Sequence, residues 1–130
     1  MLDTNMASTV FKGTSPAVDK RLSAVPIASI CLSAISEAEL LFGLAKKPDA
    51  RRLETMVREF LLPLDILPWD SAAAACYAEL RSRLERAGTP LGSMDMLIAA
   101  HALACDATLV TNDRAFQSAE GLKLADWTRA

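Results

Sequence analysis

The chain has 130 residues, of which 52% are apolar, and carries a formal net charge of −2 at pH 7. This length suffices for one compact domain over residues 1–130 and is too short for two ordinary domains. A nucleic-acid binder is usually basic overall, so any nucleic-acid contact must come from a local patch or a metal site. The chain has no apolar run long enough to cross a bilayer and no secretory pattern at its start, so we expect a cytoplasmic protein.

Helical and extended patterns alternate along the chain and are joined by short turns. Expected helices cover residues 7–12, 16–25, 36–47, 49–62, 71–87 and 93–103. Expected strands cover residues 1–2, 27–33, 64–67 and 108–111, with a further edge strand at 121–124. This alternation is typical of an α/β fold, in which helices flank a parallel sheet.

Several helix boundaries carry recognisable signals. Ser15, which precedes a proline, and Asp70 are both expected to be N-caps. Ser36 and Glu39 have the spacing of a capping box. Gly88 is expected to close the long helix just beyond its last turn.

Acidic residues stand where strands should end or helices should begin: Asp3, Glu39, Asp95 and Asp113. Parallel strands all point one way, so these side chains can converge at the carboxyl edge of the sheet, where open α/β folds build their sites. Converging carboxylates repel one another unless a cation lies among them. Mg²⁺ or Mn²⁺ suits such hard oxygen ligands. An ion of this kind can turn bound water into a nucleophile.

Each of these residues also has a purely structural interpretation. Glu39 can serve only in the capping box, Asp95 can simply favour a helix N-terminus, and Asp113 can cap a short helix around residues 114–117. Taken singly, the structural role is favoured for each, and it is their convergence that favours a metal site. His101 lies well round its helix from Asp95 and is expected to pack in the core.

The cysteines, Cys31, Cys76 and Cys105, are far apart in the sequence and have apolar neighbours. We expect them to be reduced residues of the core. Trp69 and Trp127 are expected to anchor packing.

The stretches around the acidic residues resemble the motifs of PIN-domain ribonucleases of the VapC toxin type. The matching stretches are Leu2-Asp3-Thr4-Asn5, Ala38-Glu39-Leu40 with Gly43, Gly92 to Ala102, Val110-Thr111-Asn112-Asp113 with Phe116, and Gly121-Leu122 to Asp126-Trp127. The stretch from Gly92 is the most specific of them. They occur in order and cover nearly the whole chain.

The resemblance implies a PIN-like three-layer α/β/α sandwich with a central, mainly parallel sheet of four or five strands. It implies a Mg²⁺- or Mn²⁺-dependent endoribonuclease toxin that cleaves tRNA or rRNA by attack of metal-activated water on a phosphodiester. The acidic site would comprise Asp3, Glu39, Asp95 and Asp113, all carried over as catalytic residues and metal ligands. Asp3 and Asp95 would be the firmest ligands, and Glu39 would act directly or through water.

The resemblance also implies supporting roles for residues next to the acidic ones. Thr4 and Asn5 would orient Asp3, as metal ligands generally require. Arg114, beside Asp113, is the basic residue best placed to meet a phosphate. The basic stretches at residues 46–52 and 81–86 are expected to be solvated helix faces, with an RNA groove as the alternative.

The resemblance also implies partners. A cognate VapB-type antitoxin would hold the enzyme inactive, and we expect it to present a basic side chain to the acidic pocket. We also expect a homodimer, or a heteromeric complex with the antitoxin. Apolar residues of the early helices could contribute to it: Phe11, Val18, Leu41, Leu44 and Val57.

Two other functions remain open at this point. One is a phosphohydrolase with Asp3 as nucleophile, although Asn5 stands where that motif needs a second aspartate. The other is a non-catalytic PIN-like domain that binds a partner or DNA. The sequence does not distinguish transfer RNA from ribosomal RNA, nor one metal ion from two.

Overall fold

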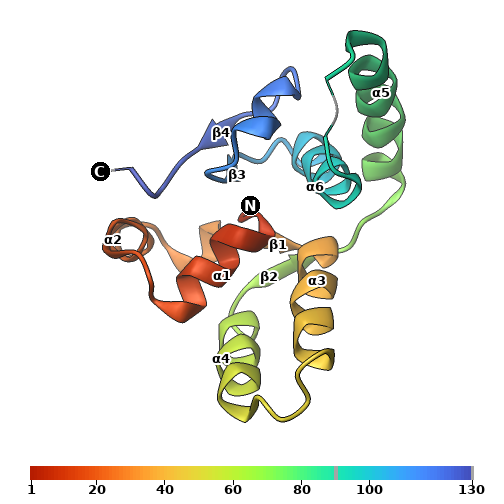
Figure 1. The fold of residues 1–130 in the computed structure, drawn as a ribbon. Coiled ribbons are helices and arrows are strands. Elements are labelled where there is room, and N and C mark those ends of the chain that lie inside the picture. Colours follow the sequence, from red (N-terminus) through yellow and green to blue (C-terminus); the bar gives the residue numbers. More distant parts are fainter. Residues whose placement is uncertain (90, 130) are drawn as a thin grey trace.

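The computed structural model describes residues 1–89 and 91–129 of the chain. Over these residues it is an α/β protein with six α-helices, two short 3₁₀ helices (η) and four short strands (Figure 1). In chain order these are α1 Thr4–Lys12, α2 Pro16–Ala24, η1 Ile27–Ser29, β1 Cys31–Ser33, α3 Ala34–Ala45, α4 Arg51–Leu61, β2 Asp65–Leu67, α5 Ser71–Ala87, α6 Ser93–Ala104, β3 Leu109–Val110, η2 Arg114–Ser118 and β4 Leu124–Ala125.

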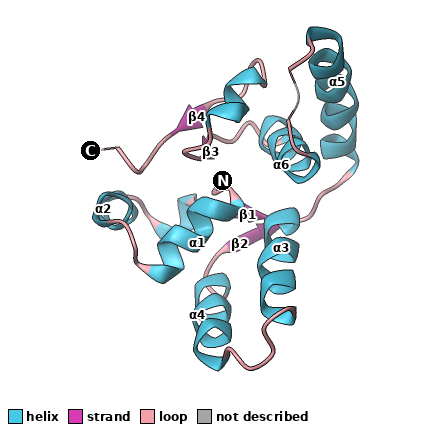
Figure 2. Ribbon diagram, viewed as in Figure 1, coloured by secondary structure: helices cyan, strands magenta, loops and turns pink. Residues whose placement is uncertain are grey.

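The strands form two parallel pairs, with β1 beside β2 and β3 beside β4 (Figure 2). Leu2 joins the pairs, because it forms parallel bridges to both Leu32 and Val110. The strands are two or three residues long, so the expected sheet of four or five strands is present as two pairs with a single linking residue. The carboxyl ends of these segments nevertheless face one way, and the residues that follow them gather at one edge.

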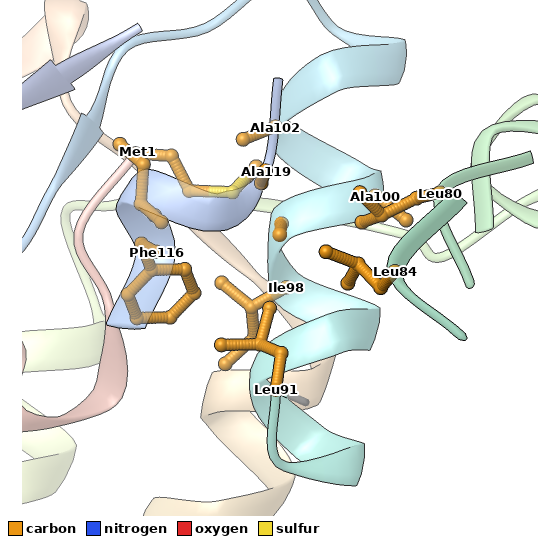
Figure 3. Close-up of a cluster of buried hydrophobic side chains, with 11 residues drawn as sticks. Met1, Leu80, Leu84, Leu91, Ile98, Ala100, Ala102, Phe116 and Ala119 are labelled. Carbon is orange, nitrogen blue, oxygen red and sulfur yellow. The ribbon is translucent and has the colours of Figure 1, made fainter. Parts of the chain in front are cut away.

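Two clusters of buried side chains hold the elements together. One lies between α5, α6, β3 and η2 and includes Leu80, Ile98 and Phe116 (Figure 3). The other packs α1, α2 and α4 around Leu2 and includes Val18 and Val57. Because Leu2 is a member of the second cluster and is 1% exposed, the chain just after it is fixed in place.

The helix signals at Ser15, Asp70 and Gly88 are confirmed. Ser15 Oγ accepts the Val18 N–H, and the Asp70 carboxylate accepts the Ala73 N–H. Gly88 ends α5 with φ +66°, a left-handed conformation that glycine adopts without strain.

Several expected boundaries differ from the structure, three of them for a clear local reason. Residues 27–29 form a 3₁₀ turn instead of the start of a strand, and Ile27 is half exposed. The first helix begins at Thr4 because Asp3 caps it. The last strand is Leu124–Ala125, displaced toward the C-terminus, because its pairing with β3 sets its position.

The cysteines are free thiols, as expected, although Cys105 is exposed instead of buried. In the described part of the chain, no helix has the length and apolar character needed to cross a membrane.

Candidate functional site

Asp3 is held both by the strand ladder and by the first helix. Its N–H donates to the Val110 carbonyl oxygen at 3.0 Å, and its Oδ1 accepts the Met6 N–H at 2.7 Å. The residue is 4% exposed. Burial raises the pKa of the Asp3 carboxyl above its ordinary value, against the opposing effect of hydrogen bonds from Thr111 and Met6. The nearby Asp113 and Glu39 raise it further.

Glu39 reaches the site from α3, but not through a capping box. Ser33 caps this helix instead, because its Oγ accepts the Ile35 N–H at 3.1 Å and the helix starts directly after β1. Ser36 and Glu39 then lie one turn apart on the face that meets Thr4. The Thr4 hydroxyl donates to Glu39 Oε1 at 2.6 Å, and a second hydrogen bond of 3.1 Å joins it to Ser36 Oγ.

Asp95 lies in the first turn of α6, whose N-cap, Gly92, has no side chain to offer. Burial raises the pKa of the Asp95 carboxyl, and the charges of Asp113, Glu39 and Asp3 raise it further. Each of these carboxylates is therefore close enough to Asp95 to disfavour its ionisation. The structure thus places Asp3, Glu39 and Asp113 near enough to Asp95 for their charges to affect it.

Asp113 is the exposed member of the group. Its carboxylate caps η2 by accepting the Ala115 N–H at 2.9 Å, as the structural interpretation expected. Its own N–H donates to Thr111 Oγ1 at 3.0 Å. The capping role and the electrostatic effect on Asp95 therefore belong to the same side chain.

Two neighbours of the carboxylates were not foreseen as site residues. Thr111 is 4% exposed and lies between Asp3 and Asp113, with a hydrogen bond to each. Ser36 is fully buried against Thr4. Their signal in the sequence is a small hydroxyl residue near each acidic residue, a pattern too common to stand out before the fold is known.

Thr4 and Asn5, which were expected to orient Asp3, form no hydrogen bond to it with their side chains in the described part of the chain. Thr4 contacts Glu39, whereas Asp3 is oriented by Met6 and Thr111. Asn5 is exposed on α1, and over residues 1–89 and 91–129 its side chain forms no hydrogen bond. Arg114 is exposed and lines a cavity together with Asp113.

His101 is a core residue, as expected. It is 1% exposed, and its Nδ1 lies 2.8 Å from the Ser33 Oγ that caps α3. Burial lowers the pKa of the imidazole. The side chain ties α6 to the end of β1 and so fixes the helix that carries Asp95.

The donor set suits a hard divalent cation, because it consists of carboxylate oxygens. In the described ranges, 1–89 and 91–129, no three His, Cys, Asp or Glu side chains come close enough to hold an ion directly among themselves. The carboxylates are instead near enough to repel one another, and the ionised forms of Asp3 and Asp95 are destabilised.

Replacing Asp95 by asparagine should therefore stabilise the metal-free chain at neutral pH. The folded state holds a proton on Asp95 more tightly than the unfolded chain does, so ionisation lowers stability progressively as pH rises above the ordinary pKa of 3.8. Asn cannot ionise. The rise in Tm of Asp95→Asn over wild type should be largest at pH 7 and should disappear toward pH 4. The exposed Asp49→Asn is the matched control, and an equal rise in both variants would contradict the account.

Several known proteins resemble this chain over most of its length. The model of the family "PIN domain" matches residues 1–122. The tRNA(fMet)-specific endonuclease VapC of Shigella flexneri is 33% identical over 129 residues, covering 98% of this chain and 97% of that protein. The ribonuclease VapC2 of Rickettsia felis is 36% identical over 102 residues, covering 78% and 76%.

Solved structures give the same result. VapBC from Salmonella typhimurium, bound to DNA, matches with a TM-score of 0.89 and 33% identity over 98% of this chain and 96% of that one. VapBC2 from Rickettsia felis, bound to a DNA fragment from the promoter, matches with a TM-score of 0.88 and 32% identity over 96% of each chain. The chain therefore belongs to the PIN domain family and, within it, to the VapC ribonuclease toxins, which are endoribonucleases.

Proposed function

We propose that the acidic edge hydrolyses RNA phosphodiesters with Mg²⁺ or Mn²⁺ held among Asp3, Glu39, Asp95 and Asp113. The supporting observation is that burial and mutual repulsion raise the pKa of both Asp3 and Asp95, a cost that a cation would remove. When bound, the ion would supply a nucleophile from water and neutralise charge on the phosphate.

In the described residues no three carboxylate side chains lie close enough to hold an ion directly, which is compatible with the way proteins hold magnesium. Mg²⁺ keeps several of its waters and commonly binds through one or two carboxylates together with substrate phosphates. We assign the direct contacts to Asp3 and Asp95, whose carboxyl pKa values are raised by burial, and contacts through water to Glu39 and Asp113. Thr4 fixes one oxygen of Glu39, and Thr111 links Asp3 to Asp113.

In the same proposal, residues 1–130 form a single PIN domain, and Leu2 acts as the middle position of one parallel sheet. The bridges from Leu2 to β1 and to β3 support a sheet of five positions with helices on both faces. This three-layer arrangement would hold the acidic residues at one edge.

The substrate we propose is tRNA(fMet), because the relatives from Shigella flexneri and Salmonella typhimurium bear that specificity in their names and are each 33% identical to this chain. Purified protein with Mg²⁺ should cut a tRNA(fMet) transcript into discrete fragments and should leave the elongator methionine tRNA largely intact. Chelator should abolish the cleavage. Equal cleavage of both transcripts would reject the substrate but keep the nuclease, and no cleavage of either RNA by folded protein would reject both.

Thr4→Val should lower cleavage by about tenfold to a hundredfold, as loss of a residue that orients a metal ligand commonly does. The isosteric valine removes the 2.6 Å hydrogen bond to Glu39 and leaves the local volume almost unchanged. Thr4→Ser keeps the hydroxyl and should restore most of the activity. Steady-state cleavage rates over a Mg²⁺ titration check this, because a variant with a misplaced Glu39 should need more Mg²⁺. Equal losses in both variants would contradict a role for the hydroxyl.

An antitoxin of the VapB type is the proposed partner, since the matching structures are described as VapBC and FitAB assemblies. A cavity of about 190 Å³ between α1, α3 and α4 is lined by apolar residues that include Phe11 and Leu44, by Glu39, and by three lysines, Lys12, Lys46 and Lys47. An apolar antitoxin segment lying there could direct a basic side chain to Glu39 and block the site.

A homodimer remains part of this proposal, but two of the expected contact residues are ruled out. Val18 and Val57 are fully buried within the protomer. Leu41 is exposed, and Phe11 and Leu44 are half-buried, so these expected residues remain available to a second copy. Phe42, 63% exposed on α3, adds an apolar side chain beside them.

A further inference from the structure

Two adjoining cavities lead away from Asp113 along the C-terminal segment. The first, of about 260 Å³, is lined by Asp113, Arg114 and Gln117 on one side and by Asp126 and Arg129 on the other. The second, of about 510 Å³, lies between Arg129 and the helix α2. Asp126 and Arg129 line both cavities, so the two adjoin. Together they are called the depression, and Asp113 lies at one end of it.

The second cavity owes its shape to one face of α2. Ala17 and Ala24 are two turns apart on this face, and Lys20 and Arg21 stand between them. The alanines leave space, and the two cations border it. Figure 1 shows the C-terminal end of the chain on the side of the molecule where α2 lies, and α5 on the far side.

Arg129 is held in place by the turn before it. Trp127 is buried in the core, and the Asp126 carboxylate accepts hydrogen bonds from the Thr128 N–H at 2.9 Å and the Thr128 hydroxyl at 2.5 Å. Asp126 also pairs with Arg129 Nε at 3.3 Å. Because a guanidinium has five donors, this pairing through Nε leaves the terminal nitrogens of the largely exposed Arg129 side chain able to meet a phosphate.

The charges along this depression fit a polyanion. Lys20, Arg21, Arg114 and Arg129 border it, and Asp113 and Asp126 are the carboxylates that line it, so its lining is net positive on a chain of net charge −2. The carboxylates at its head repel phosphate, so attraction must come from cations beside the site. Phosphate contacts of this kind supply most of the affinity that does not depend on sequence.

We propose that one strand of the RNA substrate lies along this depression, with its phosphates on a basic track made of Lys20, Arg21, Arg114 and Arg129. The track would hold the nucleotides on one side of the scissile phosphate and set the direction in which the strand crosses the carboxylates. The inference rests on the proposed function for its choice of RNA as the ligand.

The test measures binding of RNA without cleavage. The probe is a fluorescein-labelled oligouridylate of about twelve nucleotides, within the usual reach of single-strand binding sites, titrated in EDTA with anisotropy as the readout. The triple variant Lys20→Gln, Arg21→Gln, Arg129→Gln removes three charges of the track. The triple variant Arg81→Gln, Arg83→Gln, Arg86→Gln removes three exposed charges from α5 and is the matched control. Both sets are exposed, so Tm should change little.

The track variant should bind at least about tenfold more weakly at low salt. Its plot of log affinity against log salt should be shallower by about 2, since each single-strand phosphate contact contributes about 0.7 to the slope. The α5 variant should bind as the wild type does. Equal weakening of the two variants, an unchanged track variant, or a wild type that does not bind the probe would overturn the proposal. A track variant that keeps its RNA affinity but no longer binds the antitoxin would also overturn the proposal.

Failure of this proposal can be separated from failure of the proposed reaction. Binding in EDTA requires no catalysis. A wild type that cannot cleave RNA, together with a track variant that has lost RNA affinity, would retain the track and reject the hydrolytic mechanism. A wild type that cleaves tRNA, together with a track variant that binds RNA as the wild type does, would reject the track and retain the hydrolytic mechanism.

Discussion

Asp95→Asn and Asp3→Asn should each lower RNA cleavage at least about a hundredfold at saturating Mg²⁺, which corresponds to about 2.7 kcal/mol of lost transition-state stabilisation. Each substitution removes one negative charge from a proposed ligand without changing its shape. Asparagine at position 3 can still accept the Met6 N–H that the aspartate accepts at 2.7 Å, so α1 keeps its cap. The loss should therefore be chemical and not structural.

Cleavage rates and thermal unfolding, measured on the same preparations, check this prediction. Activity and stability should move in opposite directions, because the wild type carries repelling carboxylates that it needs only for function. Exposed Asp49→Asn serves as the control for loss of charge and should cleave normally. A substantial fall in Tm of either site variant, or cleavage within a few-fold of the wild type, would contradict these roles.

Phe116→Ala should have the largest effect on stability, a loss of about 3–5 kcal/mol. The ring is 1% exposed and packs in the cluster that contains Met1, Ile98 and Leu109 (Figure 3). Alanine would leave a cavity between η2 and α6 that close-packed neighbours cannot fill. Because η2 begins directly after Asp113, cleavage should also fall at temperatures where the variant is still folded.

Urea unfolding of Phe116→Ala beside Phe42→Ala isolates the effect of burial. Phe42 has the same side chain but is 63% exposed on α3, so its removal should change stability by no more than about 0.5 kcal/mol. Similar losses in the two variants would mean that the cluster around Phe116 does not carry the expected share of the stability.

The positions of the acidic residues could be predicted from the sequence because their placement follows from chain direction alone. Asp3 and Asp113 follow apolar stretches, and Asp95 opens a helix, so a parallel arrangement brings them to one edge whatever the details of packing. The starts of α2 and α5 were also predictable, since Ser15 and Asp70 act through hydrogen bonds to residues three positions further on.

The rest depends on contacts that link distant parts of the chain. Ser36 looked like an N-cap, but it lies within a helix capped by Ser33 and contacts Thr4, 32 residues earlier. Thr111 gained its place between Asp3 and Asp113 only through the pairing of Leu2 with Val110. The position of β4 along the chain is set by its pairing with β3. Local patterns carry no information on pairings of this kind.

Mn²⁺ binding, followed by the loss of the free-ion EPR signal on titration with the purified chain, tests most directly whether the acidic edge is a metal site. We predict saturable binding to the wild type, strong weakening in Asp95→Asn and in Asp3→Asn, and wild-type binding in Asp49→Asn. The absence of binding to folded wild type, or equal binding to all these variants, would contradict it.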